Sequence, residues 1–371
     1  MNIRVVIPCY NEPTMLSTIE SLLLCNKEDI HIEVIVVVNS YLISSSEIIK
    51  QNQNTYTQLK SVAQANNSST FYITPLYIDN IPGHQTGAGL PRKIGMDKAV
   101  NDFYEENNPE GIIVSLDADT TVELNYFEEI YYNFKKYNLK SATIEYHHPT
   151  EHLPENDKLR IATEAYEEYL RYYRAALEYA GYPYAYYTIG SAFAVTAKTY
   201  KQVGGMGKQQ AGEDFYFLQK VFPLGKTKFI NTTKVYPAAR ISDRVPFGTG
   251  PAIAKMLEEN QLYKLTYQVK AFEELKQLFD LLDSFFKQTS EDVVMQCKIL
   301  PKHLQAFLLE DDFFSKVEEI NQHTSSVNNF KKRFFNYFNA FKILKYLNAV
   351  HPNPYQLTQV KEQISLILPI L

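Results

Sequence analysis

The feature that most constrains the fold is an alternation of short apolar runs with longer helical patterns in the first half of the chain. The apolar runs are rich in valine and isoleucine, which is typical of strands covered on both faces of a parallel sheet. The expected strands are 3–7, 31–38, 70–78 and 111–116, and the expected helices between them are 14–24, 45–63 and 91–104. This order predicts an α/β fold with a mostly parallel, Rossmann-like sheet flanked by helices.

The chain has 371 residues, enough for one large α/β domain and a smaller addition. After Pro251 the pattern is helical almost to the last residue. We therefore predict an α/β domain over residues 1–250 and a helical C-terminal extension over residues 251–371.

Composition excludes some classes of protein. The net charge of −5 provides no basic field for phosphate backbones, which disfavours a nucleic-acid partner. The three cysteines are far apart and form no CxxC pair, as expected in a reducing compartment. No signal-like segment precedes the first strand pattern, and no apolar run approaches the roughly 20 residues that span a bilayer. These features predict a cytoplasmic protein.

Polar residues follow three of the predicted strands. They are Tyr10-Asn11-Glu12, Asn39-Ser40 and Asp117-Ala118-Asp119. Because ligands of open parallel sheets bind at the carboxyl ends of strands, we expect these three groups to meet at one edge.

Asp117 and Asp119 form a DxD pair directly after the buried run GIIVSL. Two carboxylates at this spacing can approach one divalent cation, and Mg²⁺ or Mn²⁺ completes its shell with substrate phosphates. The alternative is an ordinary acidic surface turn, and the preceding buried strand favours the metal site.

Glu213 and Asp214 precede the apolar run Phe215 to Leu218. Carboxylates in this position can simply complement the dipole of a helix. The functional alternative is that Asp214 accepts a proton from a hydroxyl group that attacks a second substrate.

Taken together, the segments IRVVIPCYNEP, SLDADT, GSAFAV and AGEDFYFLQK resemble family 2 glycosyltransferases with the GT-A fold, over about residues 1–245. The resemblance implies transfer of one sugar, with inversion, from a nucleotide-diphosphate-sugar such as a UDP- or GDP-sugar to a glycan or another hydroxyl acceptor. It also implies Mn²⁺ or Mg²⁺ as the cofactor.

The resemblance assigns roles to matching residues. Asp214 is the implied catalytic base, with Glu213 beside it, and Asp119 is the implied metal ligand, shared with Asp117, which also faces the donor. The residues that it places near the donor are Pro8, Tyr10, Glu12, Arg92, Lys93, Gly190 and Ser191. The Tyr-rich segment 166–187 is expected to shape the acceptor side.

Two positions depart from the family pattern. Asn39 stands where an Asp commonly holds the base or ribose, and its amide can both donate to and accept from a base. The third metal ligand has no obvious counterpart, with Asp243 the nearest carboxylate. In the same segment, Arg240 and Arg244 are candidates to clamp the donor diphosphate or an anionic acceptor, and the alternative is a solvated surface turn.

The segment 328–350 combines lysines with a row of phenylalanines. It predicts either the core of a helical subdomain or a homodimer interface, and the alternative is peripheral contact with the inner face of an anionic membrane. Two other functions stay open: a nucleotidyltransferase, although IPCYNEP lacks a phosphate loop, and a sugar-nucleotide-binding protein without turnover.

Overall fold

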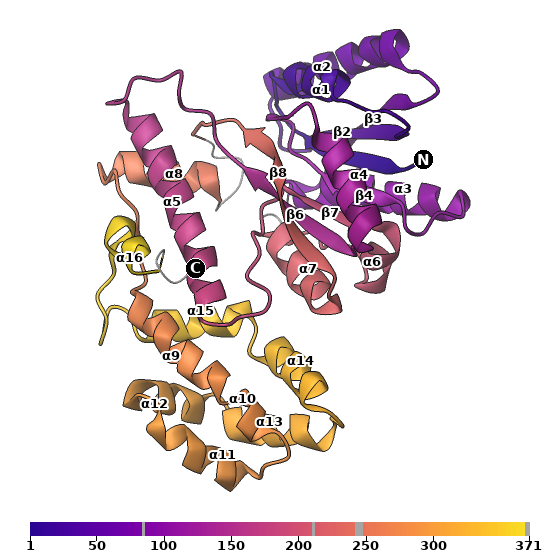
Figure 1. Ribbon diagram of the computed structural model, residues 1–371. Helices are drawn as coiled ribbons and strands as arrows, with labels where there is room; N and C mark the ends of the chain where they lie inside the picture. The colour runs from indigo at the N-terminus through magenta and orange to yellow at the C-terminus, as the bar shows by residue number, and fades with distance from the viewer. Residues whose placement is uncertain (84–85, 210–211, 242–247, 368–371) are drawn as a thin grey trace. The chain divides into compact units, whose positions relative to one another are not determined.

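The computed structural model describes residues 1–83, 86–209, 212–241 and 248–367. These residues form two compact units (Figure 1). The α/β unit comprises residues 1–163 and 188–259, and the helical unit comprises residues 164–187 and 260–371. The division into residues 1–250 and 251–371 stays a prediction. By its contacts, the inserted segment 164–187 groups with the helical unit.

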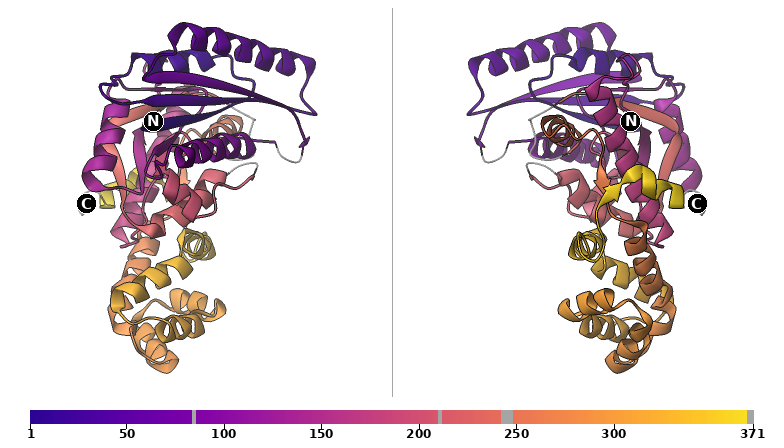
Figure 2. Two further views of the ribbon diagram at one scale, coloured as in Figure 1. Left: turned by 90° about the vertical axis from the view of Figure 1, so that its right-hand side faces the viewer. Right: turned by 90° about the vertical axis from the view of Figure 1, so that its left-hand side faces the viewer.

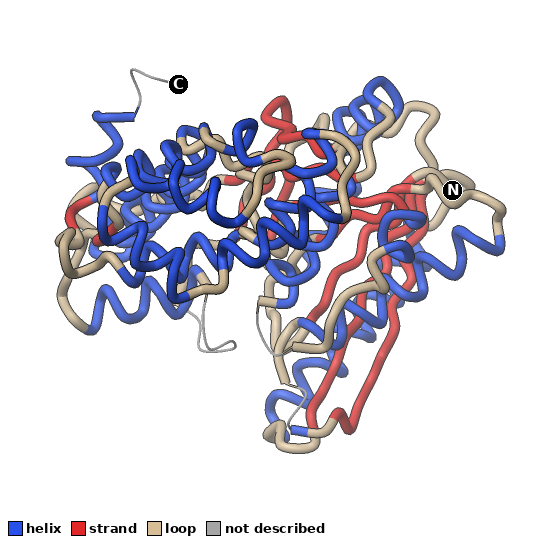
Figure 3. Tube along the Cα trace, turned by 90° about the horizontal axis from the view of Figure 1, so that it is seen from below, coloured by secondary structure: helices blue, strands red, loops and turns tan. Residues whose placement is uncertain are grey.

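An eight-stranded sheet with the order β3-β2-β1-β4-β7-β6-β8-β5 forms the centre of the α/β unit. Its strands are β1 (Ile3–Cys9), β2 (Ile32–Tyr41), β3 (Phe71–Ile81), β4 (Ile112–Ser115), β5 (Thr120–Val122), β6 (Ser141–Tyr146), β7 (Phe193–Thr196) and β8 (Thr227–Pro237). The pairs β2–β3, β1–β2, β1–β4 and β6–β8 are parallel, whereas β4–β7, β6–β7 and β5–β8 are antiparallel. In Figure 3 these strands lie side by side.

Helices cover both faces of the parallel half of the sheet (Figure 2). The helices of this unit are α1 (Met15–Leu24), α2 (Ser46–Asn66), α3 (Gly89–Glu105), α4 (Tyr126–Tyr137), α6 (Ala197–Gln202), α7 (Glu213–Val221), the short η2 (Phe222–Leu224) and α8 (Thr249–Glu258). Right-handed crossovers place α2 on one face and α3 on the other, because the strand order reverses at β1. The predicted α/β fold is confirmed, and it is the arrangement that the resemblance to GT-A glycosyltransferases implies.

The antiparallel strand β7 matters for the position of the site. Its register pairs Ser115, the last residue of β4, with Phe193, the first residue of β7. The turn at 190–191 therefore lies next to the carboxyl end of β4. Residues that precede β7 and residues that follow β1, β2 and β4 thus share one edge of the sheet.

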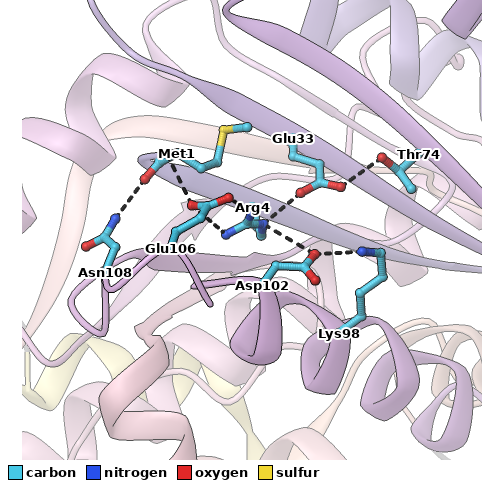
Figure 4. Close-up of polar contacts among 8 residues, drawn as sticks. All are labelled: Met1, Arg4, Glu33, Thr74, Lys98, Asp102, Glu106 and Asn108. Atoms are coloured by element: carbon cyan, nitrogen blue, oxygen red, sulfur yellow. Dashed lines mark hydrogen bonds and ion pairs between the residues drawn. The ribbon is translucent and has the colours of Figure 1, made fainter. Parts of the chain in front are cut away.

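The opposite edge is held by a buried arginine (Figure 4). Arg4, at the amino end of β1, is 3% exposed and donates from Nε to Glu33 on β2 at 2.7 Å. Its Nη2 donates to Glu106 at 2.5 Å, Asp102 of α3 lies 3.8 Å away, and the guanidinium stacks 4.1 Å from the Phe103 ring. This cluster joins two strands to α3 at a distance of one strand length, roughly 20 Å, from the site edge.

The helical unit includes most of α5 (Lys158–Tyr179) and a two-stranded sheet of β9 (Leu265–Thr266) and β10 (Thr358–Gln359). Its other helices are α9 (Val269–Asp280), α10 (Leu282–Phe285), α11 (Ser290–Gln296), η3 (Cys297–Ile299), α12 (Lys302–Glu310), α13 (Phe313–Gln322), α14 (Val327–Tyr337), α15 (Ala340–Ala349) and α16 (Val360–Ile367). Phe330, Phe334, Phe335 and Phe338 are buried, so most of the aromatic row of 328–350 forms core in this unit. Among the described helices, none is both long and apolar enough to cross a bilayer.

Candidate active site

Arg92 is the centre of the site. It lies in the first turns of α3, is 2% exposed, and its guanidinium contacts three other segments of the α/β unit. Nε donates to Glu213 Oε1 at 3.1 Å, and Nη2 donates to Asp117 Oδ1 at 2.9 Å. One guanidinium therefore joins the DxD turn to the Glu213-Asp214 pair, although the two motifs are almost a hundred residues apart.

The other amino group of Arg92 fixes the turn before β7. Its Nη1 donates to Ser115 Oγ at 2.6 Å and to the Gly190 carbonyl oxygen at 3.0 Å. Ser115 Oγ also donates to the Gly190 carbonyl at 2.6 Å. Gly190 thus reaches the site through its carbonyl oxygen, and the adjacent Ser191 is 1% exposed. The implied donor contact of these two residues stays a prediction.

Glu213 and Asp214 begin α7, after Gly212 in a left-handed conformation with φ of 72°. Glu213 is 4% exposed and is bonded to Arg92, whereas Asp214 is less buried. Burial and the neighbouring Glu213 raise the pKa of Asp214 to about 7, although Arg92 and the Phe215 N–H lower it. A pKa in this range suits a general base at neutral pH, so Asp214 stays the candidate for that role.

Asp117 and Asp119 follow β4, and their side chains remain 37% and 21% exposed. Burial by itself lowers the pKa of Arg92, but Asp117, Glu213 and Asp214 outweigh it and raise that pKa, so the guanidinium stays charged. Among the described residues no group of three or more His, Cys, Asp or Glu is arranged to hold a metal. The two carboxylates nevertheless fit Mg²⁺ or Mn²⁺, because such ions are commonly held by one or two carboxylates plus substrate phosphates and water.

Arg240, just beyond β8, lies against the second carboxylate of the DxD pair. Its Nη2 donates to Asp119 Oδ2 at 2.5 Å and also to Glu12 Oε2. Burial lowers the pKa of Arg240, but Glu12 and Asp119 outweigh that effect and raise it. The structure thus brings Arg240, Glu12 and Asp119 together at the edge predicted from the strand ends.

Asn39 lies near the end of β2 and is 1% exposed. Its amide lies close to the Tyr41 hydroxyl, but the two groups do not meet the geometric criteria for a hydrogen bond. Among the described residues, neither Nδ2 nor Oδ1 of Asn39 has a hydrogen-bond partner. Asn52 of α2 holds the Asn39 backbone by donating to its carbonyl at 2.7 Å, and accepts from the Asn11 N–H at 2.8 Å. A buried amide with unused donor and acceptor atoms suits recognition of a polar ligand edge.

Tyr10 packs against Tyr41, whose hydroxyl lies next to the Asn39 amide. Its ring centroid lies 4.6 Å from that of Tyr41, and its hydroxyl lies 3.3 Å from Ser44 Oγ. The Tyr41 hydroxyl is fixed by both backbone groups of Gly87 at 2.9 Å. Pro8 is buried within β1 opposite Val37, so it supports this end of the strand from inside the sheet.

Among the described residues, Lys93 forms no hydrogen bond or ion pair with the Arg92 cluster. Lys93 donates to Asp97 one turn further along α3 at 2.7 Å, and Asp97 also accepts from the Tyr200 hydroxyl. Arg244 and Asp243 lie outside the described residues. The donor-binding roles of Lys93 and Arg244 stay predictions.

Three residues of the site were not predicted from the sequence: Ser115, Asn52 and Tyr41. Ser115 and Asn52 are fully buried, and Tyr41 is 5% exposed. A serine inside the apolar run of β4 and an asparagine on the buried face of α2 are the available signals, because buried polar groups need partners. Tyr41 offers no such signal.

No protein-family model matches the chain, and no curated protein matches it significantly. Similar solved structures include residues 1–349 of S. aureus TarS in complex with UDP-GlcNAc, at 13% identity and a TM-score of 0.43, over 94% of this chain and 90% of that one. The same TarS segment with UDP has a TM-score of 0.42, also at 13% identity, over the same shares of the two chains. GalNAc-T7 with UDP, GalNAc and Mn²⁺ has 16% identity and a TM-score of 0.41, over 84% of this chain and 54% of that one. At TM-scores below 0.5, this similarity assigns no activity to the chain.

Proposed function

We propose that the chain is a glycosyltransferase that moves a sugar from a nucleotide-diphosphate-sugar to a hydroxyl acceptor, with inversion and with a divalent cation. The observation that carries this proposal is the Arg92 guanidinium, which bonds Asp117 and Glu213 at 2.9 and 3.1 Å. Arg92 thereby joins Asp117 of the DxD pair to Glu213, which precedes the base candidate Asp214, and a metal-dependent transfer requires a metal ligand and a base in one site.

The residues at the two ends of the cluster suit the two halves of a donor. Asn39 and Tyr10 offer an amide and an aromatic ring to the nucleotide base. Asp119 and Asp117 would hold Mg²⁺ or Mn²⁺ together with the diphosphate, where the ion would supply charge neutralisation for the leaving nucleotide. Arg240 offers a second positive charge at the same place.

The proposed reaction is a single displacement. The acceptor oxygen forms a bond to the anomeric carbon while the bond from that carbon to the phosphate oxygen breaks, and Asp214 takes the acceptor proton. A base with a pKa near 7 is ionised in about half of the molecules at neutral pH and still binds a proton well. Glu213 keeps its contact with Arg92 and so holds Asp214 in place.

The proposal extends to partners. A glycan or another hydroxyl compound is the proposed acceptor, and the Tyr-rich segment 166–187 stays the candidate to shape its binding. In the helical unit, Tyr166, Tyr169 and Tyr173 stack along α5 with ring centroids 6.0 and 6.3 Å apart. A cytoplasmic location, homodimer formation and peripheral membrane contact remain predictions from the sequence.

A thermal-shift screen with Mn²⁺ against UDP-, GDP- and dTDP-sugars tests the proposed function. We expect stabilisation by the sugars of one nucleotide, and loss of that stabilisation when Mn²⁺ is omitted. Release of the nucleoside diphosphate from that donor then separates turnover from binding. The absence of a shift with every donor would contradict the proposal, and binding without release would favour a sugar-nucleotide-binding protein.

A further inference from the structure

The carboxylate of Glu12 is hydrogen-bonded to Thr14 and to Arg240. It is 1% exposed, and Oε1 accepts from the Thr14 N–H at 3.1 Å and from Thr14 Oγ1 at 2.7 Å. Both of its carboxylate oxygens also accept from the Arg240 guanidinium, Oε1 at 3.3 Å from Nη1. A carboxylate with these partners is fixed in position and anchors Arg240, while the donor contact that the resemblance implies for Glu12 stays a prediction.

Arg240 bonds both Glu12 and Asp119 of the DxD pair. The same Nη2 atom that bonds Glu12 lies 2.5 Å from Asp119 Oδ2. The backbone next to Arg240 is fixed as well, since the Ala238 N–H donates to the Asp119 carbonyl at 3.1 Å. The side chain of Arg240 is 29% exposed, so part of it is accessible to a ligand.

Asp119 is therefore neutralised by a cation of the protein itself. A divalent ion at the same carboxylate would meet a positive guanidinium at short range, and like charges at this distance repel strongly where water is partly excluded. A nucleoside diphosphate removes this conflict, because its phosphate oxygens can accept from Arg240 and coordinate an ion at the same time.

We propose that Glu12 and Arg240 make binding of the divalent cation conditional on the donor diphosphate. Without a donor, Arg240 bonds Asp119 and lowers the affinity of the DxD pair for the ion. With a donor, Arg240 moves from Asp119 to the diphosphate while Glu12 keeps it within reach, so that nucleotide and ion bind cooperatively. Glu12 is then a positioning residue, and this inference rests on the proposed function.

The test measures Mn²⁺ binding to the full chain by electron paramagnetic resonance, with and without UDP. For wild type we expect weak Mn²⁺ binding alone and at least tenfold tighter binding with UDP. Arg240→Gln should bind Mn²⁺ alone about tenfold more tightly, with a smaller effect of UDP, and linkage requires the same reduction in the effect of Mn²⁺ on UDP affinity. Lys276→Gln, which removes an exposed ion-paired cation of α9, is the matched control and should resemble wild type.

The double variant Glu12→Gln/Arg240→Gln removes one negative and one positive charge, so the net charge of the chain is unchanged. It replaces Arg240→Gln in the test if that single variant does not fold. It should show the same gain in Mn²⁺ affinity. Unchanged or weaker Mn²⁺ binding in the folded variants would overturn the inference, while wild type that still binds UDP with Mn²⁺ would leave the proposed function intact. If wild type binds GDP or dTDP in place of UDP, the same measurements are made with that nucleotide, and wild type that binds none of the three would overturn both.

Discussion

Gly190 faces Asp214 so closely that a Cβ atom at residue 190 would lie 3.2 Å from Asp214 Oδ2. The same atom would lie 2.8 Å from Nη2 of Arg92, which is held by partners on every side. The absence of a side chain at 190 is thus what lets the base candidate and the guanidinium share one small space.

The Gly190→Ala substitution should therefore act on the site more than on the fold. We expect Arg92 to shift, its bonds to Asp117 and Glu213 to lengthen, and nucleoside diphosphate release to fall by about tenfold or more, since small misplacements of reacting groups are costly. Gly204→Ala is the control for stability, because nothing lies within 4 Å of its Cβ position, although its φ of 80° adds backbone strain. Wild-type release by Gly190→Ala would show that this close approach has no catalytic role.

Asp214→Asn tests the base. The variant keeps the shape of the side chain but cannot accept a proton, so we expect donor affinity within about threefold of wild type and a loss of roughly 10²–10⁴ in turnover. Asp280→Asn, on the exposed face of α9, is the control. Turnover near the wild-type rate would assign the base to another residue.

The raised pKa of Asp214 also predicts a pH profile. The carboxylate must be ionised to accept a proton, so kcat/KM for the transfer should rise about tenfold per pH unit below pH 7 and level off above it. The profile is measured with the donor identified by the thermal-shift screen. A profile that is flat between pH 5.5 and 8 would contradict the assignment.

The raised pKa of Asp214 also predicts how the free energy of unfolding changes with pH. The pKa of Asp214 is raised from its ordinary value of 3.8 to about 7, so between these values the folded state binds more protons than the unfolded state. The free energy of unfolding contributed by this group therefore falls as pH rises through that window. Asp214→Asn should gain stability relative to wild type from pH 5 to pH 8, measured by urea unfolding, and a constant difference would contradict the raised pKa.

Arg92 is predicted to be essential for folding stability as well as for the site. Arg92→Met leaves Asp117 and Glu213 without their shared cation, and removal of one partner from a buried ion pair costs about 3–5 kcal/mol. Urea unfolding measures this cost, with Arg174→Met on α5 as a control that removes a more exposed arginine. A loss below about 1 kcal/mol would show that Arg92 does not hold the cluster together.

Asn39 and Asn52 provide a matched pair. Asn39→Leu should keep or raise stability, because a buried amide without partners costs about 1–3 kcal/mol, yet it should weaken nucleotide binding. Asn52→Leu should lower stability, because Asn52 loses bonds to Asn11, Asn39 and Ser40. If Asn39→Leu were less stable than Asn52→Leu, or if Asn39→Leu bound the nucleotide as tightly as wild type, the proposed role of Asn39 in base binding would be contradicted.

Much of the fold could be predicted from local pattern. The run GIIVSL predicted β4, and the polar residues at the carboxyl ends of β1, β2 and β4 predicted the edge where the site lies. Strand periodicity and buried apolar runs are local properties of the sequence. The grouping of 164–187 with the helical unit was not predictable, since it depends on contacts with residues about a hundred positions away.

The partners of the site residues were not predictable for the same reason. Glu12 and Arg240 are 228 positions apart, and no periodicity or motif relates them. Arg92 was expected beside the donor, which stays a prediction. The sequence contains no sign of its bonds to Ser115, Gly190, Asp117 and Glu213.

The most direct test of the account is a crystal structure with UDP and Mn²⁺, using anomalous scattering to locate the ion. If the thermal-shift screen identifies another nucleoside diphosphate, that compound replaces UDP. We predict a manganese peak within about 2.2 Å of an Asp119 carboxylate oxygen, bridged to the diphosphate, with the nucleotide base against Asn39 and Tyr10. A manganese ion bound away from Asp117 and Asp119, or a nucleotide bound elsewhere on the chain, would contradict it.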